Sequence, residues 1–147
     1  MAKLIVDSCV FINAFKFDSK SRAQCKDLLE ELIKIKQIIT MPSHGWFEIL
    51  CSLRRIEKVD KTFSGPVING RMDYAIEFIH IDNKFIEKYG NVDIPYQKSG
   101  DHIFTVIAFV NKWPLITLDT NMIKISKKLG ISVFTPIEYI AYLKTIG

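Results

Sequence analysis

Four acidic residues stand at places in the sequence where an isolated carboxylate is costly. Asp7 and Asp119 each follow directly on a short apolar run, while Glu48 and Asp101 have mostly apolar neighbours. Few basic residues stand beside them, and an ionised carboxylate in an apolar setting needs a partner. Clustered carboxylates repel one another, and a hard divalent cation that takes oxygen ligands offsets that repulsion. The simplest interpretation is a metal site that all four acids form together.

Each acid, taken singly, also has an ordinary structural interpretation. An Asp at the start of a helix usually caps that helix, and this applies equally to Asp101 and Asp119. Glu48 could face solvent from one side of a helix, which is the more common position of a Glu. Asp7 is harder to explain in this way, because it ends an expected central strand and precedes Ser8. The prediction of a metal site thus depends on the set of four.

The elements that must position these acids are short apolar strands and amphipathic helices in alternation. Strands are expected at residues 4–6, 38–41, 76–81, 115–118 and 131–134. Helices are expected at residues 21–36, 43–59, 83–90, 101–113 and 121–129, and from residue 136 onward. Residues 60–73 contain turn signals and are expected to form a loop. The pattern predicts an α/β fold of three layers, α/β/α, with a central, mainly parallel sheet of about five strands.

In such open sheets the ligand site lies beyond the carboxyl ends of the strands, near a switch in strand order. Asp7 and Asp119 are expected at two such ends. Asp101 is expected in the first turn of a buried helix, and Glu48 in the first half of another. We therefore expect a site at this edge of the sheet.

Composition narrows the class of protein. A chain of 147 residues with 48% hydrophobic content predicts a single domain over residues 1–147. Its apolar stretches are shorter than the ~20 residues that cross a bilayer, and no signal peptide precedes Asp7, so a cytoplasmic location is expected. Cys9, Cys25 and Cys51 lack the spacing of a disulfide framework or zinc site and are expected to be reduced core residues. The net charge of +4 favours polyanionic partners only slightly.

Several other chemistries are poorly supported. His44, His80 and His102 lack metal-ligand spacing, which disfavours a zinc hydrolase. The nucleophile motif G-x-S-x-G and the phosphate-binding motifs G-x-x-x-x-G-K-[ST] and G-x-G-x-x-G do not occur. Serine-nucleophile catalysis, nucleotide hydrolysis and dinucleotide binding are thus disfavoured.

Four segments, taken in order, carry a family resemblance. An apolar strand runs into Asp and Ser in Leu4-Ile5-Val6-Asp7-Ser8, and a Glu follows in the apolar segment Trp46-Phe47-Glu48-Ile49-Leu50. An Asp opens an apolar helix in Ser99-Gly100-Asp101-His102-Ile103-Phe104, and a strand ends in Thr-x-Asp in Pro114-Leu115-Ile116-Thr117-Leu118-Asp119. Together they span nearly the whole chain and resemble the PIN-domain family, in particular its small VapC-like toxin ribonucleases.

The resemblance implies Mg²⁺ or Mn²⁺ held by Asp7, Asp101 and Asp119, with Glu48 as a further ligand or water-positioning group, and hydrolysis of RNA. It also implies the toxin half of a type II toxin–antitoxin pair, with an antitoxin partner and a homodimeric state. Asn121 departs from the family, because its position often carries another Asp. That departure leaves the number of metal ions open.

Further residues are expected to support the site. Ser8 and Thr117 could hydrogen-bond the carboxylates or metal-bound water, as could Asn121, although a Thr at a strand end also fits β-propensity alone. Basic residues at the end of the Glu48 helix are candidates for RNA binding, with a solvated helix end as the alternative. These residues are Arg54, Arg55, Lys58 and Lys61.

Two other functions stay open. A catalytically weak PIN scaffold could bind RNA or a protein partner, and Asn121 keeps this alternative open. An aspartate-based phosphotransferase could use Asp7 as its nucleophile. Dehalogenase-like enzymes of that kind carry a second acid two residues on, where this chain has Cys9.

Overall fold

The computed structural model describes residues 3–59 and 75–147. They include a five-stranded, all-parallel sheet with the strand order β3-β2-β1-β4-β5. The strands are β1 (Leu4–Val6), β2 (Ile39–Pro42), β3 (Ile76–Ile79), β4 (Leu115–Ile116) and β5 (Val133–Phe134). The helices are α1 (Ser8–Phe15), α2 (Arg22–Lys34), α3 (Ser43–Val59), α4 (Asn83–Tyr89), α5 (Ser99–Asn111), α6 (Thr120–Lys128) and α7 (Pro136–Ile146). The predicted fold class is confirmed.

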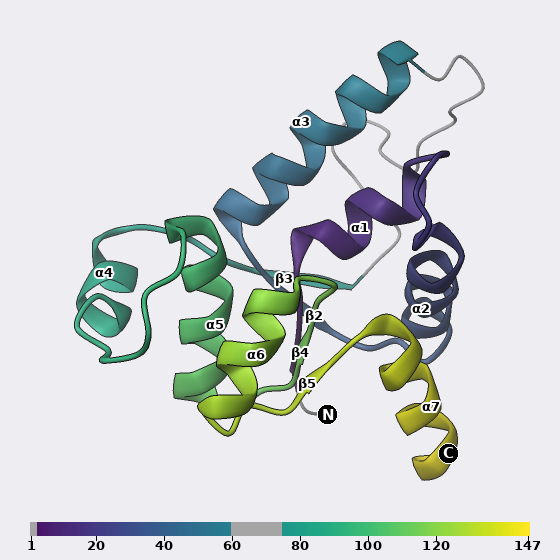
Figure 1. Cartoon of the computed structure of the whole chain (residues 1–147). Helices are drawn as coiled ribbons and strands as arrows, with labels where there is room; N and C mark the ends of the chain where they lie inside the picture. Colours follow the sequence, from purple (N-terminus) through teal and green to yellow (C-terminus); the bar gives the residue numbers. More distant parts are fainter. Residues whose placement is uncertain (1–2, 60–74) are drawn as a thin grey trace.

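The helices form two outer layers (Figure 1). On one side of the sheet, α1 packs against α2 and α3, and α2 packs against α7. On the other side, α5 packs against α4 and α6. Each parallel strand pair needs a crossover, and helices make these crossovers while covering the apolar faces of the sheet. No described helix is both long enough and apolar enough to cross a bilayer.

Strand β1 lies at the centre of the sheet. All three of its residues are almost completely buried, which explains their continuous apolar character. The chain passes from β1 to β2 and β3 on one side, then returns to place β4 on the other side of β1. The strand order therefore reverses between β1 and β4, and their carboxyl ends border the crevice where α/β proteins bind ligands.

Several elements differ from the sequence-based prediction. Helix α1 has no counterpart among the predicted elements, because its sequence is apolar nearly throughout and shows no clear helical periodicity. Strand β4 ends at Ile116, so Asp119 does not follow it directly. Ser21 occupies the cap position of α2, yet its side chain makes no capping hydrogen bond. The loop predicted at residues 60–73 lies outside the described residues.

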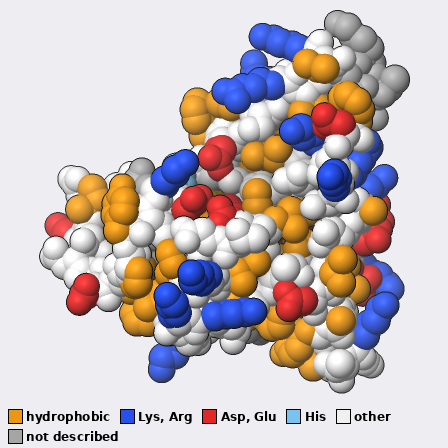
Figure 2. Space-filling view, in the orientation of Figure 1, with side chains coloured by type: hydrophobic (Ala, Val, Ile, Leu, Met, Phe, Trp, Pro, Cys, Tyr) orange, Lys and Arg blue, Asp and Glu red, His pale blue; other side chains and the backbone are white. Residues whose placement is uncertain are grey.

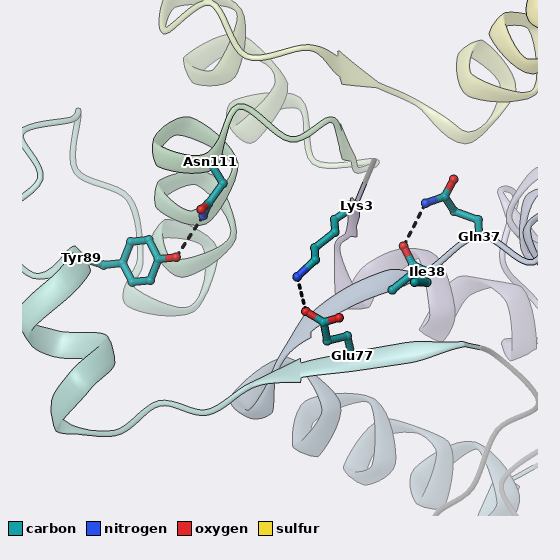
Figure 3. A network of polar contacts seen from close by, with 6 residues as sticks. All are labelled: Lys3, Gln37, Ile38, Glu77, Tyr89 and Asn111. Atoms are coloured by element: carbon teal, nitrogen blue, oxygen red, sulfur yellow. Dashed lines mark hydrogen bonds and ion pairs between the residues drawn. The ribbon is translucent and has the colours of Figure 1, made fainter. Parts of the chain in front are cut away.

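Figure 3 shows three polar contacts of the fold. Lys3, just before β1, forms an ion pair with Glu77 of β3 across the intervening strand β2. The amide of Asn111 at the end of α5 donates to the Tyr89 hydroxyl of α4 at 3.0 Å. Gln37 donates to the carbonyl oxygen of Ile38 at 3.0 Å, just before β2. The exposed ion pair contributes at most about 1 kcal/mol, so apolar burial dominates the stability of the fold.

Gly45 sets how closely α3 approaches α5. A Cβ atom at this position would lie 2.8 Å from Cζ of Phe104 and 3.0 Å from Sδ of Met41. We expect Gly45→Ala to lower the free energy of unfolding by about 1 kcal/mol, because overpacking costs more than the gain in helix propensity. Gly100→Ala is the matched control, since its added Cβ would meet nothing closer than 3.6 Å. Urea denaturation measures both; equal stability of the two variants would contradict the packing argument.

Candidate active site

A pocket of about 350 Å³ opens beyond the carboxyl ends of β1 and β4. The four predicted acids all line it, although they come from four different segments of the chain. Its lining residues are Asp7, Ser8, Cys9, Ile12, Glu48, Asp101, Leu118 and Asp119. Figure 2 shows acidic side chains gathered in the middle of this face, with basic side chains over α3 on one side and over α6 on the other. The structure thus brings the four acids together at the reversal of strand order.

Asp7 is the most deeply buried of the four acids, with 4% of its surface exposed. It stands between β1 and α1, where its side chain makes no capping hydrogen bond. Instead, its Oδ2 atom accepts from the Cys9 thiol at 3.0 Å and from the Thr117 hydroxyl at 2.8 Å. Its Oδ1 atom lies 3.4 Å from the Ser8 hydroxyl. Side-chain donors therefore hold Oδ2, and the backbone N–H of Cys9 also acts on the Asp7 carboxylate.

Thr117 connects Asp7 to Asp119. Its buried hydroxyl donates to Asp7 Oδ2 and accepts from the backbone N–H of Asp119 at 3.0 Å. Asp119 in turn caps α6, because its Oδ1 accepts from the backbone N–H of Met122 at 2.9 Å. The predicted hydrogen bond from Thr117 to a carboxylate is confirmed. Asp119 is both a helix cap and a pocket residue, so the two interpretations of it are compatible.

Ser8 connects Asp7 to Glu48. The Ser8 hydroxyl donates to a carboxylate oxygen of Glu48, which confirms that it hydrogen-bonds one of the four acids. Glu48 itself is exposed, which corrects the expectation of apolar surroundings. The neighbouring Phe47 is also exposed, with 69% of its surface open to solvent. The buried face of α3 is formed by Gly45, Ile49 and Leu53.

Asp101 reaches the pocket from the first turn of α5. The cap position of this helix is Lys98, so helix capping does not explain Asp101. His44 on α3 lies 3.1 Å from the carbonyl oxygen of Gly100, and its ring packs against Phe104 with the centroids 5.4 Å apart. These contacts attach the start of α5 to α3 and so fix the position of Asp101.

The electrostatics of the pocket follow from burial and from the shared negative charge. Burial raises the pKa of Asp7, hydrogen bonds from Cys9 and Thr117 oppose this, and the charge of Glu48 adds to the increase. Burial also raises the pKa of Asp101, as do the charges of Asp7, Asp119 and Glu48. The charges of neighbouring acids therefore act on Asp7 and Asp101, and the pocket favours either bound protons or a bound cation.

Cys9 differs from the expected core cysteine, because it is half-buried and lines the pocket. Burial and the adjacent Asp7 carboxylate raise the pKa of its thiol. The thiol therefore stays protonated and can donate to Asp7. Cys25 is a buried core residue as predicted, Cys51 is half-buried, and all three cysteines are free.

The donor set fits a hard divalent cation. The two ion pairs among the described residues are Lys3–Glu77 and Lys34–Glu31, so neither involves a pocket acid. Carboxylate oxygens are preferred ligands of Mg²⁺ and Mn²⁺. Within residues 3–59 and 75–147, no group of three or more acidic, His or Cys side chains is arranged as a formed metal cage. The fit is therefore one of ligand chemistry and shared charge.

Other residues from the sequence-based prediction lie away from the pocket lining. Asn121 is exposed in the first turn of α6 and is not among the lining residues, and its supporting role stays a prediction. Arg54, Arg55 and Lys58 are exposed on the last turns of α3. Lys61 lies outside the described residues.

Comparison with known families gives a match to the PIN domain over residues 4–128. The chain belongs to the PIN-domain family. PIN domains are generally nucleases and typically depend on a divalent metal ion. The match includes the segments that carry all four pocket acids, and it extends from β1 through α6.

Solved structures include similar chains. One is the crystal structure of VapBC2 from Rickettsia felis bound to a DNA fragment from their promoter. The similarity covers 90% of this PIN-domain chain and 98% of that chain, with 15% sequence identity and a TM-score of 0.49. A comparison with curated proteins found no match.

Proposed function

We propose that this PIN-domain protein is an endoribonuclease that hydrolyses RNA phosphodiester bonds with Mg²⁺ or Mn²⁺. The observation that carries the proposal is the convergence of four carboxylates on one pocket at the reversal of strand order, without an ion-pair partner in the described residues. Asp7, Asp101 and Asp119 are the proposed direct ligands, and Glu48 is a ligand or positions the attacking water. The ion supplies activation of water and stabilisation of charge on the phosphate.

The hydroxyl groups of Ser8 and Thr117 orient the acids. Thr117 holds Asp7 Oδ2 and the backbone of Asp119, so the ends of β1 and β4 keep one relative position. Ser8 holds Glu48 against the start of α1. Asp7, held in place by these hydrogen bonds, would be one of the residues that bind the ion. Groups that orient metal ligands in this way tune metal affinity and activity.

Basic side chains flank the acidic pocket and provide attraction for the RNA backbone. Arg54, Arg55 and Lys58 do so from α3, and Lys61 follows in the sequence. On the other side, Figure 2 shows basic side chains over α6. The last turn of this helix carries Lys127 and Lys128, which sequence reasoning did not single out. Neutralising phosphates with such cations gives affinity that does not depend on base sequence.

We extend the proposal to the biological role. The PIN domain of residues 4–128 resembles the toxin halves of type II toxin–antitoxin pairs, so we propose a protein antitoxin as a partner and a homodimer as the functional state. The antitoxin is expected to be encoded beside this chain. It should suppress the ribonuclease activity when the two proteins are mixed.

A cleavage assay with the purified protein tests the proposal. Fluorescent single-stranded RNA should be cut with Mg²⁺ or Mn²⁺ and left intact with EDTA, because the proposed mechanism needs a bound ion to activate water. The ends of the products show whether cleavage is internal. Addition of the proposed antitoxin, the protein expected to be encoded beside this chain, tests the toxin role. RNA binding without cleavage would instead favour the catalytically weak scaffold. A trapped aspartyl-phosphate at Asp7 would favour the phosphotransferase.

A further inference from the structure

Residues 96–98, which lead into α5, combine three side chains with different environments beside the pocket. Tyr96 is 84% exposed, more than any other large hydrophobic side chain in the described part of the chain. Gln97 is only 3% exposed, and Lys98 is exposed. Lys98 lies close enough to Asp101 for its charge to lower the pKa of that acid, against the larger effect of burial. The segment therefore borders the acidic pocket.

The buried residue of this segment anchors the two exposed ones. Gln97 Nε2 donates to the Thr105 hydroxyl on α5 at 2.9 Å, and both side chains are buried. The backbone at Lys98, the cap position of α5, has φ −51° and ψ 138°. Tyr96 and Lys98 are both exposed, and they stand before and after the buried Gln97, which its hydrogen bond fixes to the helix.

The ring of Tyr96 has one supported side and remains largely open to solvent. Its centroid lies 6.3 Å from that of His102, and the planes of the two rings are inclined by 33°. His102 directly follows Asp101 in α5, so this pair of rings stands next to a pocket carboxylate. A large aromatic surface left open beside a nuclease pocket offers a stacking surface for an unpaired base.

We propose that Tyr96 and Lys98 bind single-stranded RNA where it leaves the pocket, Tyr96 by stacking on an unpaired base and Lys98 by pairing with a phosphate. This inference rests on the proposed ribonuclease function and adds a preference for unpaired substrate. The combination of an exposed aromatic ring and an exposed cation on an anchored segment favours a nucleic acid strand, which presents a base and a charged phosphate in each nucleotide. It places RNA contacts at the start of α5, apart from the basic end of α3.

Binding measurements test the inference separately from catalysis. Fluorescence anisotropy with a labelled single-stranded RNA oligonucleotide is measured in an Asp7→Asn background with EDTA, so that the RNA stays intact. Tyr96→Ala should weaken binding roughly 5- to 150-fold, the range for loss of one stacked base, and Tyr96→Phe should retain it. Affinity falls as salt rises, and Lys98→Ala should make the slope of log affinity against log salt less negative by about 0.7. The matched controls on α7, Tyr142→Ala and Lys144→Ala, should bind like the parent protein.

A duplex of the same sequence distinguishes stacking from general attraction. Its bases are already stacked, so Tyr96→Ala should leave duplex affinity unchanged. Three results would overturn the inference. Tyr96→Ala could lose equal affinity for single strand and duplex, it could bind the single strand unchanged, or the protein could show no measurable RNA binding. Tyr96-dependent binding by a protein that never cleaves RNA would refute only the proposed nuclease function. Cleavage with Tyr96-independent binding would refute only the stacking role.

Discussion

Asp7→Asn is expected to reduce metal-dependent RNA cleavage by more than about a hundredfold. Residues that merely hydrogen-bond metal ligands already contribute roughly 10- to 100-fold, so loss of a charged ligand should cost more. The amide has the same shape as the carboxylate, and its oxygen can still accept from Cys9 and Thr117. The fold should therefore persist. Initial cleavage rates of labelled RNA with Mn²⁺ measure the effect.

The control for this prediction is Asp27→Asn, which removes the same charge from an exposed position on α2. It should cleave RNA at the parental rate. Circular dichroism of both variants should match the parent protein, which separates loss of catalysis from loss of structure. Full activity of a correctly folded Asp7→Asn protein would remove Asp7 from the proposed site.

The second large effect is a pH-dependent change in stability that a divalent ion reverses. Burial raises the pKa of Asp7 in the folded protein, so the folded state binds its proton more tightly than the unfolded state. The resulting stabilisation is fully present below the unfolded pKa of about 4 and is lost as the pH rises through the raised folded pKa. The metal-free protein should therefore lose this contribution above pH 4, while Asp7→Asn should not.

Thermal unfolding in EDTA over a series of pH values measures this difference. The Tm of Asp7→Asn relative to the parent should increase with pH and then level off. Mn²⁺ at 100 times its Kd should stabilise the parent protein by about 2.7 kcal/mol, or roughly 5–10 °C in Tm. Asp7→Asn should gain much less. A pH-independent difference between the two proteins, or equal stabilisation by Mn²⁺, would contradict a buried, metal-binding carboxylate at this position.

The order and type of most elements could be predicted from the sequence because their patterns are local. The run Leu4–Val6 is apolar because β1 is buried on both faces, and Asp82 and Gly90 mark the ends of α4 by ordinary capping preferences. The first-turn position of Pro136 in α7 is also confirmed, within a capping box formed by Thr135 and Glu138. Helix α1 lacked such a signal, since an apolar segment packed against two other helices shows little periodicity.

The four acids could be named in advance because their residue types and apolar neighbours are visible in the sequence. Their individual environments could not. Only the folded chain shows that Glu48 is exposed, that Asp101 is not a helix cap and that Asn121 lies apart from the pocket lining. Burial and hydrogen bonding depend on which distant segments pack around a side chain, and no local pattern contains that information.

The proposed metal site consists of four acids spread along the chain from Asp7 to Asp119. The sequence by itself determined their identity and their order. The tertiary structure decided that they share one pocket, because the return of the chain from β3 to β4 places the ends of β1 and β4 side by side. It also decided that Thr117 holds Asp7. This hydrogen bond joins residues far apart in the sequence, and it forms only when strand order and helix packing are fixed.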